Sequence, residues 1–313
     1  MKVMSVNDEK TYVEEHEFNY LNMIDNAVRK RLIYIVERFA LRFNIYDYWK
    51  NSFHTETKRL TDLGIGAERI FWKVISEEFS DWHPVPIYIG SNLFFETEDA
   101  YVNIDIKTAY IDNVRDLGGL VEVGDAQTSY PMMKKYGSKE RFQPKIKTYY
   151  EIKENNKIVR KYALTYFIQI IYEKPEIIIQ NSLDRGPIGI VLVSMPNGLL
   201  YDVYGDNIVG HPKSYRTKEG KRERPSNYRF YYNKCPCYKL LNNKNYPCNF
   251  RFRLYFNTKY NGYKRITNLS DKDGQEIIVT PEFILAFRSE DCYIYRNLYG
   301  CVDCENTCYL VYF

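Results

Sequence analysis

Apolar residues recur at three- and four-residue steps in two stretches near the start of the chain, which is the spacing of an amphipathic helix. The first stripe predicts a helix over residues 17–43 and comprises Phe18, Leu21, Ile24, Val28, Leu32, Ile35 and Phe39. The second predicts a helix from about residue 64 to residue 79 and comprises Ile65, Ile70, Phe71, Val74 and Ile75. Pro84 and Pro86 follow and stop helical structure, because proline lacks the amide hydrogen that a helix needs.

From residue 87 the pattern becomes that of strands, with short apolar or alternating runs between turn residues. The predicted strands are 87–89, 93–95 and 100–107, and a polar turn over 96–99 joins the last two. Residues 145–152 and 158–172 predict two more strands or a strand followed by a helix, and 176–180 and 189–195 predict buried strands. Asn197-Gly198 marks a turn, and an apolar pattern resumes over 276–287.

These elements predict an α/β fold, with a mixed central sheet of five or six strands flanked by helices. No internal repeat or low-complexity linker divides the chain. We therefore expect a core over residues 1–200, whose N-terminal helices contribute to dimerisation. Residues 201–313 are expected to form an additional basic region that is integrated with this core.

Composition argues against membrane and secreted proteins. No segment approaches the roughly 18 consecutive apolar residues of a transmembrane helix. The first ten residues contain no apolar secretion signal. We expect a cytoplasmic protein, in which the seven cysteines stay reduced.

Positive charge is concentrated in one segment. Residues 211–265 hold fifteen lysines and arginines against two acids, a net charge of +13, so the rest of a chain whose total is +4 carries −9. Such a field is typical of a protein that binds a polyanion. Nine interleaved tyrosines argue against the alternative, a merely solvated basic loop. The segment predicts contacts to nucleic acid from Lys213, Arg216, Lys221, Arg222, Arg224 and Arg229.

The stretch Asn103-Ile-Asp-Ile-Lys-Thr108 combines a buried-strand pattern with reactive side chains. Alternate residues of a strand share a face, so Asp105 and Lys107 should project together while Ile104 and Ile106 point into the core. A carboxylate beside an amine suits a reaction that needs a metal ligand and a cation next to an attacking water. An isolated Asp-x-Lys is common by chance; the apolar flanks and the preceding hairpin make this one informative.

This stretch resembles the second motif of the PD-(D/E)xK nuclease superfamily, and within it the EcoRV/HincII-like branch of type II restriction endonucleases. The resemblance implies a restriction-endonuclease-like fold and a first catalytic Asp on the strand before Asp105. For a turn centred on residues 97 and 98, pairing 94 with 102 and 92 with 104 or 105 brings Ser91 or Asn92 opposite Asp105. The thirteen-residue separation of the HincII-like pattern selects Asn92.

Asn92 therefore stands where the family has Asp. Its amide oxygen can ligate a metal, but without the charge that attracts Mg²⁺. Two interpretations follow: the chain is an inactive Asp-to-Asn variant, or the first acid comes from elsewhere. Asp99 lies ~20 Å from Asp105 along the same strand, which excludes it as a shared ligand unless the strand folds back. The remaining candidates for the first acid are Glu96, Glu98 and Asp81.

Two further segments extend the resemblance to roughly residues 60–135. Residues 64–69 resemble the helix that delivers a Glu toward the metals, which implies a catalytic role for Glu68; an acid stabilised by the helix dipole is the alternative. Residues 124–130 resemble a segment that contacts the DNA backbone; an ordinary polar turn is the alternative. If the resemblance holds, this segment supplies DNA contacts from Gln127, Thr128, Ser129 and Tyr130.

The resemblance implies a magnesium-dependent, sequence-specific DNA endonuclease. Mg²⁺ would be held by Asp105, position 92 and the carbonyl of Ile106, and Lys107 would orient the attacking water. Cleavage of double-stranded DNA would leave 5′-phosphates. A homodimer that reads a palindromic site is expected, together with a cognate DNA methyltransferase in the cell.

The cysteines raise a second metal hypothesis. Cys235 and Cys237 together with Cys301 and Cys304 offer four thiolates for a structural Zn²⁺, although the Cys-x-Cys spacing favours reduced, packed thiols. Two rival functions remain: a non-catalytic DNA-binding protein on the nuclease fold, supported by Asn92, and a structure-specific repair nuclease. The large basic region argues against the second rival.

Overall fold

The computed structural model of the protein describes residues 6–39, 62–86, 90–110, 117–132, 142–154, 156–172, 187, 189–210, 215–216, 222–223, 228–241, 250–256, 269–270, 276–277 and 311–312. Within these residues no helix is both long and apolar enough to cross a bilayer.

Two helical segments precede the sheet in the chain. Helix α1 spans Val6–Lys30 and is followed, after a turn at Arg31, by a helical stretch over 32–39. The predicted first helix is confirmed over these residues, but α1 begins eleven residues before position 17, and positions 40–43 lie outside the described part. Helix α3 spans Asp62–Glu78 and confirms the second apolar stripe.

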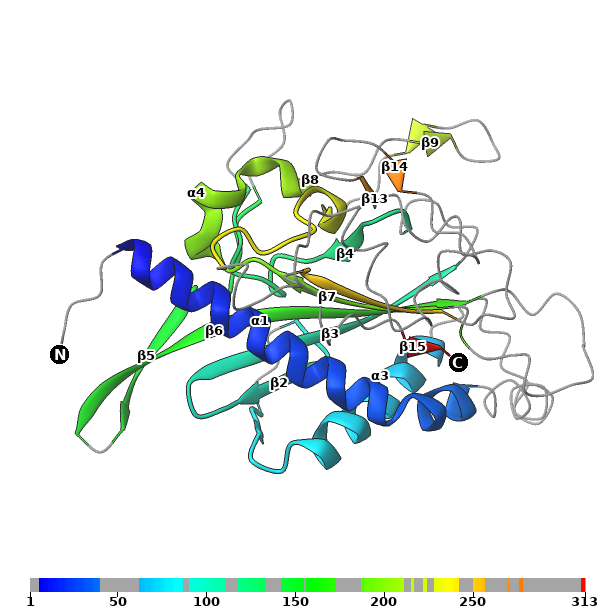
Figure 1. Ribbon diagram of the computed structural model, residues 1–313, viewed down its shortest axis with the longest axis horizontal. Coiled ribbons are helices and arrows are strands. Elements are labelled where there is room, and N and C mark those ends of the chain that lie inside the picture. The colour runs from blue at the N-terminus through cyan, green and yellow to red at the C-terminus, as the bar shows by residue number, and fades with distance from the viewer. Residues whose placement is uncertain are drawn as a thin grey trace, which may run out of the picture.

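An eight-stranded sheet forms the centre of the described fold, in place of the five or six strands expected (Figure 1). Its order is β1-β2-β3-β6-β7-β12-β15, and β5 pairs separately with β6. Parallel pairing of β3 with β6 and of β12 with β15, beside antiparallel pairs elsewhere, makes the sheet mixed. The strands are β1 His83–Pro84, β2 Leu93–Glu96, β3 Ala100–Tyr110, β5 Tyr149–Glu154, β6 Lys157–Tyr172, β7 Gly189–Met195, β12 Phe252–Phe256 and β15 Val311–Tyr312.

Shorter elements complete the described chain. A three-stranded sheet has the order β4-β11-β8, and two hairpins pair β9 with β10 and β13 with β14. The strands are β4 Val121–Val123, β8 Val209–Gly210, β9 Tyr215–Arg216, β10 Arg222–Glu223, β11 Tyr228–Phe230, β13 Leu269–Ser270 and β14 Glu276–Ile277. The remaining helical turns are η2 Gly198–Leu200, α4 Tyr201–Tyr204, η3 Asp206–Ile208 and η4 Tyr232–Lys234.

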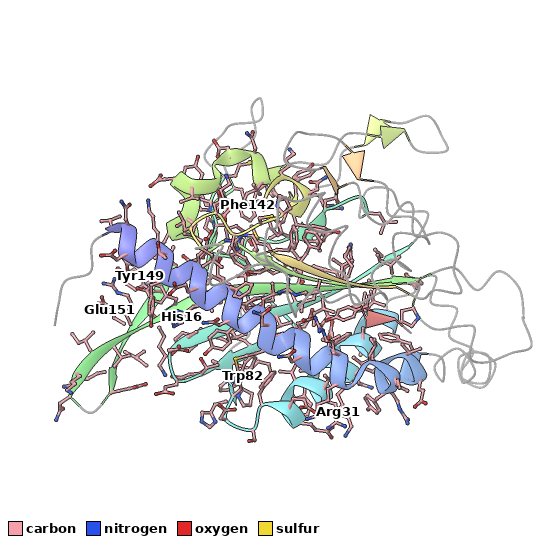
Figure 2. All side chains as sticks on the ribbon, in the orientation of Figure 1. His16, Arg31, Trp82, Phe142, Tyr149 and Glu151 are labelled. Carbon is pink, nitrogen blue, oxygen red and sulfur yellow. The ribbon has the colours of Figure 1, made fainter. Side chains whose placement is uncertain are left out.

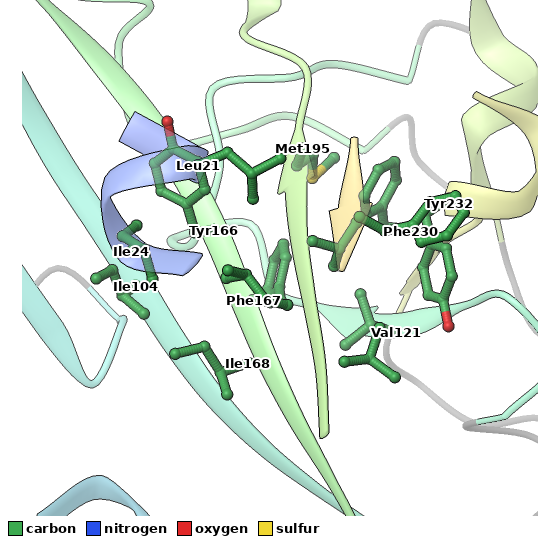
Figure 3. Packing of buried hydrophobic residues seen from close by; sticks show 14 of the residues in the cluster. Leu21, Ile24, Ile104, Val121, Tyr166, Phe167, Ile168, Met195, Phe230 and Tyr232 are labelled. Atoms are coloured by element: carbon green, nitrogen blue, oxygen red, sulfur yellow. The ribbon is translucent and has the colours of Figure 1, made fainter. Parts of the chain in front are cut away.

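Both faces of the central sheet are covered. Figure 3 shows Tyr166 and Ile168 of β6 on the side of α1, and the Tyr166 hydroxyl donates to the carbonyl of Glu17 on that helix at 2.9 Å. Phe167, one residue along, faces the other way and contacts Phe230 of β11. A strand buried on both faces is a continuous apolar run, which explains why residues 158–172 form a strand instead of a helix. The expected strands at 87–89 and 176–180 lie outside the described residues.

Segments on either side of residue 200 share sheets. Strand β12 pairs with β7 of the central sheet, and β11 pairs with β4. Strands β8, β11, β12 and β15 of region 201–313 therefore belong to sheets that also contain strands from before residue 200, whereas β9–β10 and β13–β14 pair only with each other.

A buried ion cluster fastens α1 to this core. The guanidinium of Arg251 contacts Glu17 at 2.7 Å and Glu14 at 3.0 Å, and all three side chains have 0% exposure. The faces of Tyr204 and Tyr238 lie 4.7 and 4.0 Å from the same guanidinium. Burial raises the pKa of Glu17 to about 7, against the lowering effect of Arg251. The packing of the first half of α1 therefore depends on Arg251, which lies more than 230 residues further along the chain.

Replacing Arg251 by methionine tests this cluster. Because it removes one partner of a buried ion pair, we expect the free energy of unfolding near pH 8 to fall by about 3–5 kcal/mol. Folding raises the pKa of Glu17 from 4.5 to about 7, so the folded protein binds this proton more tightly than the unfolded chain does. The stabilisation that results is complete below pH 4.5 and is lost as the pH rises through 7. The effect of the substitution should therefore shrink toward about pH 5. Urea denaturation at both pH values measures it.

Arg160→Met is the matched control, because Arg160 makes ion pairs with Glu9 and Glu151 while 38% of its side chain is exposed. We expect this change to cost less than about 1 kcal/mol. Equal stability of the two variants would contradict the role given to Arg251.

Candidate active site

The register of the β2–β3 hairpin determines which residues face Asp105. Leu93 pairs with Ile104, Phe94 with Asn103 and Glu96 with Tyr101. One further step along this register brings Asn92 opposite Asp105, as the sequence predicted. Nearer the turn the expected pairing of 94 with 102 was wrong by one residue, because the turn spans Thr97 to Ala100 and is closed by a hydrogen bond of 2.9 Å between them.

Asn92 joins three parts of the chain. Its side-chain oxygen accepts a hydrogen bond from the backbone N–H of Ile106 at 2.6 Å. Its amide nitrogen donates to Oε1 of Glu68 on α3 at 2.7 Å. Helix α3 therefore delivers Glu68 to the hairpin, and position 92 lies between this carboxylate and the strand that carries Asp105.

Asp105 and Lys107 project together from β3. Their charged atoms, Oδ2 and Nζ, lie 2.7 Å apart. Asp105 is 2% exposed whereas the Lys107 side chain is 22% exposed, so the pair leads from the interior toward the surface. Ile104 and Ile106 are buried in the opposite direction, as predicted. Burial raises the pKa of Asp105, and the neighbouring Lys107 opposes this shift.

The donor set fits a hard cation. Oδ2 of Asp105 is buried and receives no hydrogen bond of acceptable angle, although Lys107 is within ion-pair distance. The carboxylate of Glu68 and the amide oxygen of Asn92 add oxygen donors, the type that Mg²⁺ prefers. Among the described residues no three His, Cys, Asp or Glu side chains gather as metal ligands.

The other candidates for the first acid lie at the turn end of the hairpin. Glu96 pairs with Lys161 at 2.9 Å. Asp99 accepts a hydrogen bond from the Tyr20 hydroxyl at 2.5 Å and contacts His16 at 2.9 Å. Figure 2 shows His16 on α1. Asp81 and Glu98 are exposed. The alternatives based on Glu96, Glu98 and Asp99 are thus separated from Asp105 by most of the length of β2, while Glu68 is the acid that reaches position 92.

The segment 124–130 is the polar turn that the sequence left open as an alternative. Thr128 caps the backbone N–H of Tyr130, Ser129 accepts a hydrogen bond from Gly198 N, and the Tyr130 hydroxyl donates to the carbonyl of Gly205. All three side chains are buried, so in this structure they serve the interior and offer no surface to DNA. Gln127 is also buried, but it lies within the site, 3.4 Å from Lys107.

Few of the predicted basic contacts are described. Arg229 of β11 is 4% exposed and pairs with Glu122 at 3.3 Å, so it supports the small sheet, and the prediction that it contacts DNA is not supported. Arg216 and Arg222 lie on β9 and β10 and pair with each other in the register of these strands. Lys213, Lys221 and Arg224 lie outside the described residues.

The cysteine hypothesis is only half described. Cys235 is buried and Cys237 is partly buried, and burial raises the pKa of the Cys235 thiol to about 12. Cys301 and Cys304 lie outside the described residues, so the zinc hypothesis stays a prediction.

Gly90 is a site residue that the sequence did not single out. Its φ of +94° is the left-handed conformation that glycine adopts without strain, and a Cβ here would approach that of Ala126 to 2.5 Å. The signal was the Gly-Ser pair directly before Asn92. Gly90 lets the loop before β2 lie against the 124–127 turn, and so it controls the position of residue 92.

The fold, with an acid and an amine beside a hairpin at the edge of a mixed sheet, is that of a restriction endonuclease. The restriction endonuclease BglI bound to its DNA recognition sequence is similar with a TM-score of 0.53 and 17% identity, over 79% of this chain and 94% of that chain. Tetrameric SfiI bound to cognate DNA is similar with a TM-score of 0.51 and 13% identity, over 86% and 93%. At these identities the likeness establishes the fold.

The family follows from the sequence. Residues 9–176 match the family described as type II restriction enzyme MwoI, N-terminal domain. This match covers more than half of the 313 residues, and the chain belongs to that family. A comparison with curated protein sequences finds no match.

Asn92→Asp tests the metal fit of the site. The substitution replaces the donor to Glu68 by a second carboxylate, so we expect the thermal midpoint in EDTA to fall by roughly 2–4 °C. Mg²⁺ should restore the midpoint in this variant, since a ligand that binds only the folded state stabilises it. Differential scanning fluorimetry with and without Mg²⁺ measures both effects.

Asn207→Asp is the control, because Asn207 is exposed and remote in sequence from the site. Its midpoint should not depend on Mg²⁺. If the Asn92→Asp midpoint is equally indifferent to Mg²⁺, no cation binds at this site.

Proposed function

We propose that the protein is a type II restriction endonuclease that hydrolyses double-stranded DNA at a specific sequence, with Mg²⁺ as cofactor, and leaves 5′-phosphates. The observation that supports this proposal is the convergence of Glu68, Asn92, Asp105 and Lys107 in a chain that belongs to a type II restriction enzyme family. The thirteen-residue separation of positions 92 and 105 is the argument for an EcoRV/HincII-like arrangement of the motif.

Each group has a distinct role in this proposal. Asp105, Asn92 and Glu68, with the carbonyl of Ile106, would hold Mg²⁺, which supplies positive charge to the scissile phosphate and increases the acidity of water. Lys107 orients the attacking water and stabilises the negative charge that develops on the phosphate. Its contact with Asp105 keeps the amine beside the metal ligands, at the border between the interior and the solvent.

Position 92 limits the reaction in this chain. An amide contributes an oxygen ligand without charge, so the site attracts Mg²⁺ less than an acid at the same place would. We propose that this chain holds DNA and cuts it slowly or not at all, as an Asp-to-Asn variant would. The rival reading, a DNA-binding protein that has kept the nuclease fold, rests on the same amide and differs in the effect of restoring the acid.

The expected partners follow from the reaction. BglI and SfiI are described bound to their DNA sites, and we expect this chain also to bind double-stranded DNA. Cleavage of both strands requires two sites, so we propose a cytoplasmic homodimer on a palindromic sequence and a cognate methyltransferase that protects the host DNA. The net charge of +13 over residues 211–265 would bind phosphates and increase the affinity.

Plasmid cleavage with Mg²⁺ tests the proposal. We expect Asn92→Asp to produce discrete fragments and the parent to act at least about tenfold more slowly, because the metal ligand regains its charge. Adding Lys107→Met to Asn92→Asp should lower the single-turnover rate roughly 10²–10³-fold through loss of charge stabilisation at the phosphate.

Lys157→Met on the exposed tip of the β5–β6 hairpin is the control, and its cleavage rate should equal that of its parent. Random nicking, or cutting confined to branched DNA, would refute sequence-specific cleavage. Binding of DNA without cleavage by either form at position 92 would instead identify the non-catalytic binder.

A further inference from the structure

Gln127 occupies an unusual position in the site, because it bonds to the loop before residue 92 and to the amine of Lys107 at once. Its amide nitrogen donates to the carbonyl of Gly90 at 3.0 Å. Its amide oxygen accepts from Gly124 N at 2.8 Å and from Lys107 Nζ at 3.4 Å. The partners fix the orientation of the amide, since only the nitrogen can donate to a carbonyl and only the oxygen can accept from an ammonium.

The backbone of Gln127 is anchored separately from its side chain. Its carbonyl accepts hydrogen bonds from Asn103 Nδ2 at 2.6 Å and from Thr165 Oγ1 at 3.2 Å. These donors lie on β3 and β6, so the residue is fixed to the two parallel strands of the central sheet. A change of the side chain leaves these two bonds in place, and a variant at 127 should fold.

Nζ of Lys107 lies 2.7 Å from Asp105 Oδ2 as an ion pair and donates a hydrogen bond to Gln127 Oε1 at 3.4 Å. Gly90 lies two residues before Asn92 and packs on Ala126, the neighbour of Gln127. One amide therefore constrains both the loop that carries the ligand at position 92 and the amine at the opposite side of Asp105.

We propose that Gln127 is a positioning residue that couples the 90–92 loop to Lys107 and sets the distance between the metal-ligand position and the amine. This inference rests on the proposed nuclease function of the site. It replaces the expectation of a DNA contact from Gln127, because both ends of the buried amide are already bonded within the chain.

Three substitutions separate the two bonds. Gln127→Leu keeps the approximate size and removes both. Gln127→Glu keeps an acceptor for Lys107 and Gly124 but removes the donor to Gly90. Gln143→Leu makes the same change at an exposed glutamine and is the control. Each is made in the full-length chain, in whichever form at position 92 cuts DNA faster.

The first measurement is single-turnover cleavage beside DNA affinity with Ca²⁺ in place of Mg²⁺. We expect Gln127→Leu to lower the rate roughly 10–100-fold, as misplacement of catalytic groups does, with the affinity changed less than about threefold. Gln127→Glu should recover part of the rate through its acceptor, and Gln143→Leu should match its parent. An unchanged rate in Gln127→Leu, or equal losses of rate and affinity, overturns the inference.

The second measurement does not depend on cleavage. Hydrogen exchange of peptides that cover residues 90–94 should accelerate at least about threefold in Gln127→Leu and Gln127→Glu, because both lose the bond to Gly90. Unchanged exchange in both variants overturns the inference even if no form of the protein cuts DNA.

Asp105→Asn separates the two claims. Cleavage that survives Asp105→Asn refutes the proposed function of the site. Cleavage that is abolished by Asp105→Asn and unaffected by Gln127→Leu refutes only the role of Gln127. Faster exchange at 90–94 without any cleavage by either form at position 92 retains the positioning role and refutes the nuclease.

Discussion

The pairing of Leu93 with Ile104 brings position 92 opposite Asp105, and the arrangement of the site depends on this register. Side chains alternate along a strand, so a slip of β2 by one residue against β3 would remove Asn92 from its place opposite Asp105, while β3 stays paired with β6. The turn end of the hairpin holds the register. Asp99 is fixed there by His16 and Tyr20, whose hydrogen bonds lower its pKa to about 2, and Glu96 is fixed by Lys161. Asp99 and Glu96, which the sequence offered as possible metal ligands, thus stabilise the turn end of the hairpin whose other end carries Asn92 and Asp105.

The site lies on the polar face of β3, and the fold covers that face. Asn103 and Asp105 are buried there, where Asp105 pairs with the apolar Phe167 of β6 and Asn103 with Thr165. Buried polar groups are tolerated when they have partners. Gln127 supplies the partner of Asn103 through its backbone and an acceptor for Lys107 through its side chain. Oδ2 of Asp105 and Oδ1 of Asn103 are exceptions among the described residues, because both are buried and accept no hydrogen bond, and such exceptions concentrate at functional sites.

The sequence pattern predicted those parts of the molecule that depend on interactions between residues close together in the chain. Strand β3, the facing position of Asn92 and the common face of Asp105 and Lys107 follow from period-two alternation and the length of one turn. Contacts between residues far apart in the sequence could not be predicted from these patterns. No local pattern marked Glu14 and Glu17 as buried residues, yet both are buried against Arg251, more than 230 residues away, and α1 begins before its apolar stripe. Residues 158–172 allowed strand or helix until the layers on both faces were known, and Thr128 to Tyr130 looked available because their buried partners lie near residues 198 and 205.

The neutral amide of Asn92 lies between two carboxylates, those of Glu68 and Asp105, and so adds no third negative charge to the site. Glu68 and Asp105 approach the same region, and the pKa of Asp105 responds to the charge of Glu68 as well as to burial and Lys107. Asn92 donates to Glu68 and accepts from Ile106, so both ends of its amide are bonded without a cation. A carboxylate there would accept from Ile106 equally well but would face Glu68 with a like charge, which a cation would relieve. If the site holds Mg²⁺ as proposed, position 92 would exchange stability of the metal-free protein for affinity for the metal, the trade between stability and function that is usual at active sites.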